Sequence, residues 1–152
     1  MNRHPYLRAY MAGIVVPSLW LLLVLTAYFI VRFVWQDPFP VERVLPFPMA
    51  LVPGVFGLWN MLYVKLYSHW HHPIGLHGMA LPFFLGPIGF AVAAGSGIAS
   101  VDRGTLVYHI GGHLAIIPHW YLWIAPFVAL AVYYLVWKYL VGYCNRVLEL
   151  PF

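Results

Sequence analysis

Residues 75–101 read GLHGMALPFFLGPIGFAVAAGSGIASV and contain no Asp, Glu, Lys or Arg. About 20 consecutive apolar residues in a helix span the roughly 30 Å hydrocarbon core of a bilayer. Three further apolar runs fill most of the remaining sequence. The sequence therefore predicts an all-α membrane protein, built as a bundle of four transmembrane helices with spans at about 11–35, 49–67, 76–100 and 118–146.

The composition supports this class of protein. The 152 residues are 63% hydrophobic and only 8% charged, with a mean hydropathy of +0.81, whereas about 25% of the residues in a soluble domain are charged. No polar stretch is long enough to fold outside the membrane, so residues 1–152 are predicted to form a single integral membrane domain. The net charge of +4 is scattered over the predicted helix ends, which indicates membrane topology and anionic-lipid contact and no nucleic-acid partner.

The loop charges predict how the protein is oriented. With four spans, both termini and the loop between the second and third spans share one side of the membrane. The positive-inside rule counts Lys and Arg, and five against three places both termini in the cytoplasm. The five are Arg3, Arg8, Lys65, Lys138 and Arg146, and the three on the opposite side are Arg32, Arg43 and Arg103.

The first and last apolar runs carry further membrane signals. The run from Met11 to Trp35 is too long for the apolar region of a cleavable signal peptide, so we expect it to remain as the first span. The last run has aromatic residues at both ends, which predicts belts at headgroup depth. These residues are Trp120, Tyr121 and Trp123 at one end and Trp137, Tyr139 and Tyr143 at the other.

The third predicted span contains small residues at close to four-residue spacing, namely Gly78, Gly86, Gly89, Ala93 and Gly97. Such a pattern lets helix backbones approach closely, so this helix is predicted to pack centrally. Asn60 in the second span is predicted to donate a hydrogen bond across to it. Pro82 and Pro87 suggest an alternative, a broken helix that lines a binding site in a small transporter or channel.

Three of the eight histidines precede the last span on the outer side. His109 and His113 are four residues apart and would share one face of a helical turn. Together with His119 they could hold a divalent metal ion with an open position for water, and Asp102 could orient one imidazole. An interfacial segment whose histidines face headgroups and water explains the same residues without a metal.

A second group of histidines lies near the loop between the second and third spans. His69, His72 and His77 could supply the two axial ligands of a haem b or hold a second metal ion, if they face each other at similar depth. A cytoplasmic loop at headgroup depth, where His and Trp are common, is the alternative. The single Cys144 excludes intramolecular disulfides and cysteine-built metal sites.

Three classes of function fit these features. The first is a non-catalytic subunit or scaffold of a membrane complex, which binds the bilayer and either other membrane chains or copies of itself. The second is a histidine-ligated metal or haem redox protein, and the third is a small transporter or channel. No carboxylate lies within a predicted span, which disfavours an Asp/Glu proton relay. The sequence leaves open whether the protein is an enzyme.

Overall fold

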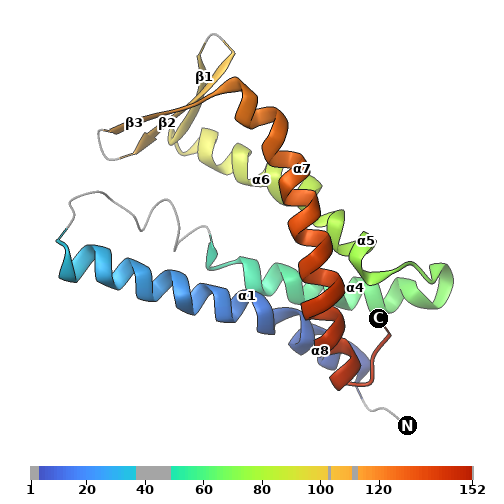
Figure 1. The fold of residues 1–152 in the computed structure, drawn as a ribbon. Helices are drawn as coiled ribbons and strands as arrows, with labels where there is room; N and C mark the ends of the chain where they lie inside the picture. The colour runs from blue at the N-terminus through green and yellow to red at the C-terminus, as the bar shows by residue number, and fades with distance from the viewer. Residues whose placement is uncertain (1–3, 37–48, 103, 111–112, 152) are drawn as a thin grey trace.

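The computed structural model describes residues 4–36, 49–102, 104–110 and 113–151, and Figure 1 shows that most of them are helical. Arg3, Arg43 and Arg103 of the loop-charge count lie outside the described residues. Helix α1 (Pro5–Phe29) continues into a π-helical turn, η1 (Ile30–Val34). Helix α4 (Val52–Trp70) runs back alongside α1 (Figure 1).

Two glycines let α1 and α4 pack closely together. A Cβ atom added to Gly13 would lie 2.6 Å from the carbonyl oxygen of Phe56, and one added to Gly57 would lie 2.6 Å from the ring of Tyr10. Because neither glycine has a side chain, the two backbones approach closely, as small residues permit in membrane helices. This pair is therefore the closely packed unit of the fold.

The second half of the chain forms a helical arm and a long rod. Helix α5 (Ile74–Met79) is followed after Ala80 by α6 (Leu81–Gly95). Helix α7 (His119–Leu135), the π-helical turn η2 (Val136–Val141) and α8 (Gly142–Val147) follow one another directly and form a rod that crosses the α1–α4 pair (Figure 1). Pro82 stands in the first turn of α6, where its missing N–H costs little, so it does not break the helix.

A small antiparallel sheet connects α6 to α7. Its strands are β1 (Ala99–Asp102), β2 (Thr105–Ile110) and β3 (His113–Ile117), in the order β1-β2-β3. The prediction of an all-α chain is therefore wrong here, and the third predicted span ends at Gly95, not residue 100. Gly97 has a left-handed backbone with φ +73°, which ends the helix, and the β-branched and aromatic residues that follow favour strands.

In the part of the chain that the structure describes, three helices are long and apolar enough to cross a membrane: Pro5–Val34, Ile74–Gly95 and His119–Val147. They correspond to the first, third and fourth predicted spans and support a membrane protein. Helix α4, which covers the second predicted span, is outside this group. Its 19 residues include Asn60, Lys65 and three residues at its C-terminal end, Ser68, His69 and Trp70, which lower its hydropathy.

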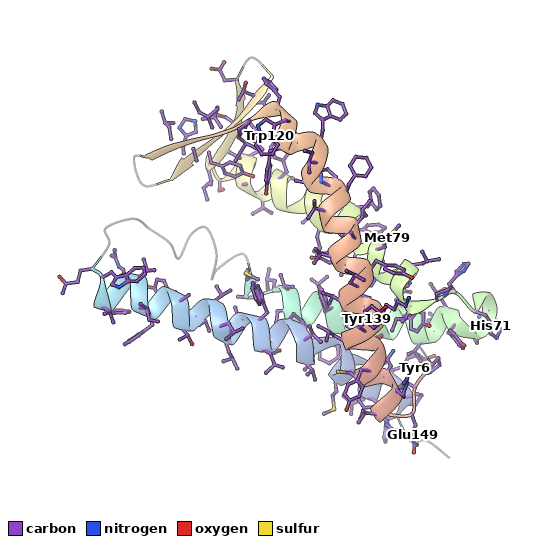
Figure 2. The ribbon with its side chains drawn as sticks, viewed as in Figure 1. Tyr6, His71, Met79, Trp120, Tyr139 and Glu149 are labelled. Atoms are coloured by element: carbon purple, nitrogen blue, oxygen red, sulfur yellow. The ribbon has the colours of Figure 1, made fainter. Side chains whose placement is uncertain are left out.

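The core lies where α4, α5 and η2 meet. Its buried side chains are Phe56, Tyr63, Ile74, Leu81, Trp137 and Val141. The C-terminal tail returns to α1, where Leu150 packs on Ala9 and Ala12 and the Arg8 guanidinium lies 3.8 Å from the Glu149 carboxylate. Figure 2 shows Tyr6, His71 and Glu149 at one end of the molecule and Trp120 at the other.

Candidate functional site

The outer histidines lie on the sheet and at the start of α7. His109 is in β2, where its Nε2 shares a hydrogen bond of 3.1 Å with the Ser100 hydroxyl. His119 begins α7, and its Nε2 lies 3.2 Å from the Thr105 hydroxyl. The predicted helical face for His109 and His113 is wrong, because the two residues lie on paired strands and the residue that pairs with His113 is Ile110. The side chain of His113 lies outside the described part of the chain.

The inner histidines have separate partners. His69 Nδ1 lies 2.8 Å from the Ser68 hydroxyl, and the His72 carbonyl accepts a hydrogen bond of 3.1 Å from the Tyr63 hydroxyl. His77 joins α5 to α4. Among the residues that the structure describes, no group of three His, Cys, Asp or Glu side chains is placed to hold a metal ion, so His69, His72 and His77 form no ligand cluster there. The outer set includes the side chain of His113, which lies outside the described residues, and that set stays a prediction.

His77 and Trp59 form a reciprocal contact between α5 and α4. Trp59 Nε1 donates to the His77 carbonyl, and His77 Nε2 donates to the Trp59 carbonyl, each over 3.0 Å. The two rings stack with their centroids 4.9 Å apart. The indole nitrogen of Trp59 and the Nε2 of His77 are thus both used in hydrogen bonds between the two helices, which gives His77 a structural role that the sequence pattern did not indicate.

Trp137 also differs from its prediction. The sequence placed it in a headgroup belt, but its side chain is fully buried in the core. Its ring lies against the backbone of Gly78 and 6.0 Å from the His77 ring. Tyr139 and Tyr143 of the same predicted belt are exposed, as headgroup contact requires.

Asn60 and Asn145 form a buried amide pair between α4 and α8. Asn60 Nδ2 donates to Asn145 Oδ1 over 2.7 Å, and Asn145 Nδ2 donates back to Asn60 Oδ1 over 3.1 Å. Asn60 Nδ2 also donates to the Ala9 carbonyl over 2.8 Å, and Asn145 Nδ2 to the Pro151 carbonyl over 3.1 Å. Asn60 therefore ties its helix to α1 and α8, and the predicted bond to the glycine-lined helix is wrong.

The small residues from Gly86 to Gly97, in α6 and the turn after it, lack close neighbours among the described residues. A Cβ atom added to Gly86, Gly89 or Gly97 would have no described atom within 4 Å, and Ala93 is only half-buried. The prediction that this stripe packs centrally is therefore wrong for the part from Gly86 to Gly97 in the described chain, whereas Gly78 does pack in the core. The described glycines whose added Cβ atom would come within 3.0 Å of a neighbour are Gly13, Gly57, Gly75 and Gly78. Of these, only Gly78 belongs to the stripe predicted from the spacing.

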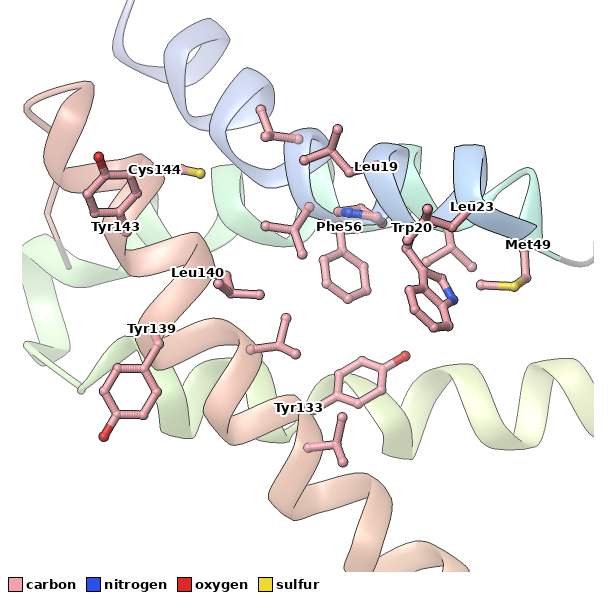
Figure 3. Close-up of a pocket in the computed structure, with 16 residues that line it drawn as sticks. Leu19, Trp20, Leu23, Met49, Phe56, Tyr133, Tyr139, Leu140, Tyr143 and Cys144 are labelled. Atoms are coloured by element: carbon pink, nitrogen blue, oxygen red, sulfur yellow. The ribbon is translucent and has the colours of Figure 1, made fainter. Parts of the chain in front are cut away.

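A lateral groove lies between the middle of α1 and the rod near η2 (Figure 3). Its volume is about 760 Å³, and 16 residues line it. Leu19 and Leu23 come from α1, Phe56 comes from α4 at the back, and Val132 and Leu140 come from α7 and η2. The lining is almost wholly hydrocarbon and aromatic, so the groove suits an apolar guest in the bilayer.

Comparisons with known proteins give no relative. The chain matches no protein-family model, no curated protein and no solved structure. The surfaces that stand out on the described chain are the uncovered small-residue face of α6 and the lateral groove.

Proposed function

We propose that this chain is a non-catalytic subunit or scaffold of a membrane complex, in which α6 packs against a transmembrane helix of another chain. The observation that carries the proposal is the uncovered face of α6 formed by Gly86, Gly89 and Ala93. In a bilayer, helices associate through close backbone approach and not through a hydrophobic drive. A small-residue face without an intrachain neighbour is suited to a helix from elsewhere.

The rest of α6 supports the same interpretation. Leu81, at its start, is fully buried in the core, whereas Phe83, Phe84, Ile88 and Val92 are all exposed. The helix is thus anchored in the core at its start, and Figure 1 shows it extending from there away from the α1–α4 pair toward the sheet. Of these side chains, Phe83 and Val92 lie about 90° to either side of the glycine face, so the helix presents both the close contact and the flanking bulk that a partner helix needs.

We infer that α4 crosses the membrane together with the three longer helices, which gives four spans. Its 19 residues rise about 28 Å, close to the thickness of the hydrocarbon core, and it runs back along α1. Asn60, its most deeply placed polar side chain, is buried on the amide of Asn145 and not exposed to lipid. With the charge count from the sequence, both termini are then cytoplasmic.

The histidine contacts favour this function over a metal or haem protein. A haem would need two imidazoles that face each other with a ring nitrogen directed at the iron. His77 instead uses its Nε2 on the Trp59 carbonyl, and His109 and His119 share hydrogen bonds with separate hydroxyl groups. These contacts fit structural and interfacial histidines.

A photocrosslinking experiment tests the partner surface. A photoreactive amino acid in place of Phe90, which is next to the small face and 42% exposed, should give an adduct of one defined mass in intact membranes. Gly89→Leu should abolish the adduct because the side chain would hold the partner backbone away. Gly95→Leu makes the same change about 150° around the helix from the small face and should leave the adduct intact. An adduct insensitive to Gly89→Leu, or none at all, would contradict the proposal.

A further inference from the structure

Strand β3 is an open edge of the sheet in the part of the chain that the structure describes. The strand order is β1-β2-β3, and Figure 1 shows the sheet extending sideways from the start of α7. The residues of β3, HLAII, include no Asp, Glu, Lys, Arg or Pro, and its pairing with β2 is continuous, without a bulge. Charges, prolines and bulges are features that keep an edge strand from pairing with another chain. Strand β3 is therefore open to such pairing.

The opposite edge of the sheet differs from β3. Strand β1 follows α6 closely in the chain and buries Ala99. It also carries the carboxylate of Asp102 at its end, and a charge on an edge strand discourages pairing. Of the two edges, β3 is the one suited to a further strand.

The hydrogen bonds of the sheet show which groups of β3 point outward. The N–H of His109 donates over 2.7 Å to the carbonyl of the residue just before β1. Successive residues of a strand direct their N–H and C=O groups to opposite sides, so Tyr108 bonds to β3, where it is opposite Ala115. Leu114 and Ile116, on either side of Ala115, then direct these groups away from β2. No described residue forms a backbone hydrogen bond with them on that side.

This set of outward groups is complementary to itself. A second copy of β3, laid antiparallel with the two Ala115 residues opposite each other, places Leu114 of each copy opposite Ile116 of the other. Both residues direct their N–H and C=O groups into the gap between the strands, so each pair exchanges two N–H···O bonds. The two Ala115 residues form the closer pair, with Cα atoms about 4.5 Å apart, and their methyl groups leave room for it.

The side chains of the same residues are complementary too. Leu114 is 66% and Ile116 65% exposed, and alternate residues of a strand share one face of the sheet. In the paired arrangement each of these side chains gains an apolar neighbour directly opposite, the contact that stabilises neighbouring strands. The backbone and the side chains of β3 thus both fit a second copy of this strand.

The two faces of the sheet fit the orientation that such a pair requires. Two copies inserted in the same direction are related by a twofold axis along the membrane normal, and the axis between antiparallel edge strands is perpendicular to the sheet. The sheet must therefore lie along the membrane surface, with one face toward water. The register puts Ser100, Asp102, Thr105 and His109 on one face and Ala99, Val101, Leu106 and Tyr108 on the other. The exposed Trp120 and Trp123 at the start of α7 indicate headgroup depth there.

We propose that two copies of this chain pair through β3, antiparallel about a twofold axis at Ala115, so that their two sheets join into one. The contact is small, so it depends on the high effective concentration of copies confined to one membrane and is lost on dilution in detergent. It uses no residue of α6. It stands or fails independently of a partner helix there.

Disulfide formation in the membrane tests the register. In a Cys144→Ser background, which removes the native thiol, Ala115→Cys should form an intermolecular disulfide on mild oxidation, because a Cα separation of about 4.5 Å suits the bond. Ile116→Cys is the control on the same strand, 65% exposed, but its two Cα atoms would lie about 8–9 Å apart, too far for a disulfide. Equal disulfide formation by both variants, or none by Ala115→Cys, would overturn the proposal.

Proline at the edge tests the hydrogen bonds. Ile116→Pro removes an outward N–H that β2 does not use, so it should abolish the Ala115→Cys disulfide, and slow hydrogen exchange at Tyr108 checks that the chain's own ladder remains. Val101→Pro makes the same change on the outward side of β1, at a residue 64% exposed, and should leave the disulfide intact. A disulfide that survives Ile116→Pro but is lost with Gly89→Leu would show that the copies meet through α6, which contradicts pairing at β3.

Discussion

Gly78 stands where the fold leaves no room for a side chain. A Cβ atom there would point directly into the ring of Trp137, which is fully buried in the core. The Trp137 ring cannot swing away, because it is also in contact with His77 and Phe56. Close contact between α5 and η2 therefore depends on this glycine.

Gly78→Ala should destabilise the protein by about 1–3 kcal/mol through overpacking. Gly86→Ala is the control, since it makes the same change in a helix with no described atom within 4 Å and should be neutral or stabilising by up to about 1 kcal/mol. Thermal unfolding in detergent measures both. An unchanged melting temperature for Gly78→Ala would show that α5 and η2 are not packed as described.

Single residues also show how far the sequence could predict the site. Asn60 stood out because a polar amide within an apolar run needs a partner, and it is fully buried and hydrogen-bonded. Its partner, Asn145, is 85 residues away, and only the crossing of the rod over α4 brings them together. The prediction that Trp137 lies in a headgroup belt was wrong for the same reason. The pattern of residues along one helix does not reveal which of its sides another helix covers.

The segment between α6 and α7 shows the same limit for a whole element. Its histidine spacing was interpreted as a helical turn, but Ala99–Asp102, Thr105–Ile110 and His113–Ile117 are strands. A local signal for this was present, because Gly111-Gly112 separates two runs rich in β-branched residues, which is typical of a hairpin. The long apolar runs on both sides of this segment favour membrane helices, and that pattern led to the helical interpretation.

The strand arrangement has a measurable consequence. Strand β2 pairs with β1 on one side and β3 on the other, so its amides have ladder partners in both directions. Hydrogen exchange of the solubilised protein should therefore be slower at Leu106, Val107 and Tyr108 than at the flanking residues of the edge strands β1 and β3. Equally fast exchange across residues 99–117 would contradict the sheet.

At the scale of the whole molecule, apolar length predicted three helices well. These helices are Pro5–Val34, Ile74–Gly95 and His119–Val147. The arrangement of the helices was not predictable, because it depends on Gly13, Gly57 and Gly78, whose close contacts join helices distant in the sequence. The resulting fold has one tight pair, α1 and α4, and a crossing rod, which leaves both the face of α6 and the lateral groove uncovered.

The proposed topology has four membrane crossings, with the termini and the α4–α5 turn on the cytoplasmic side. Sided labelling of single cysteines in a Cys144→Ser background, which removes the native thiol, tests this most directly. Tyr6→Cys and Ser68→Cys should react with an impermeant maleimide only after the inner face is exposed, and Val101→Cys should react in intact cells. Labelling of Tyr6→Cys and Ser68→Cys from opposite sides would show that α4 does not cross, and would contradict the account.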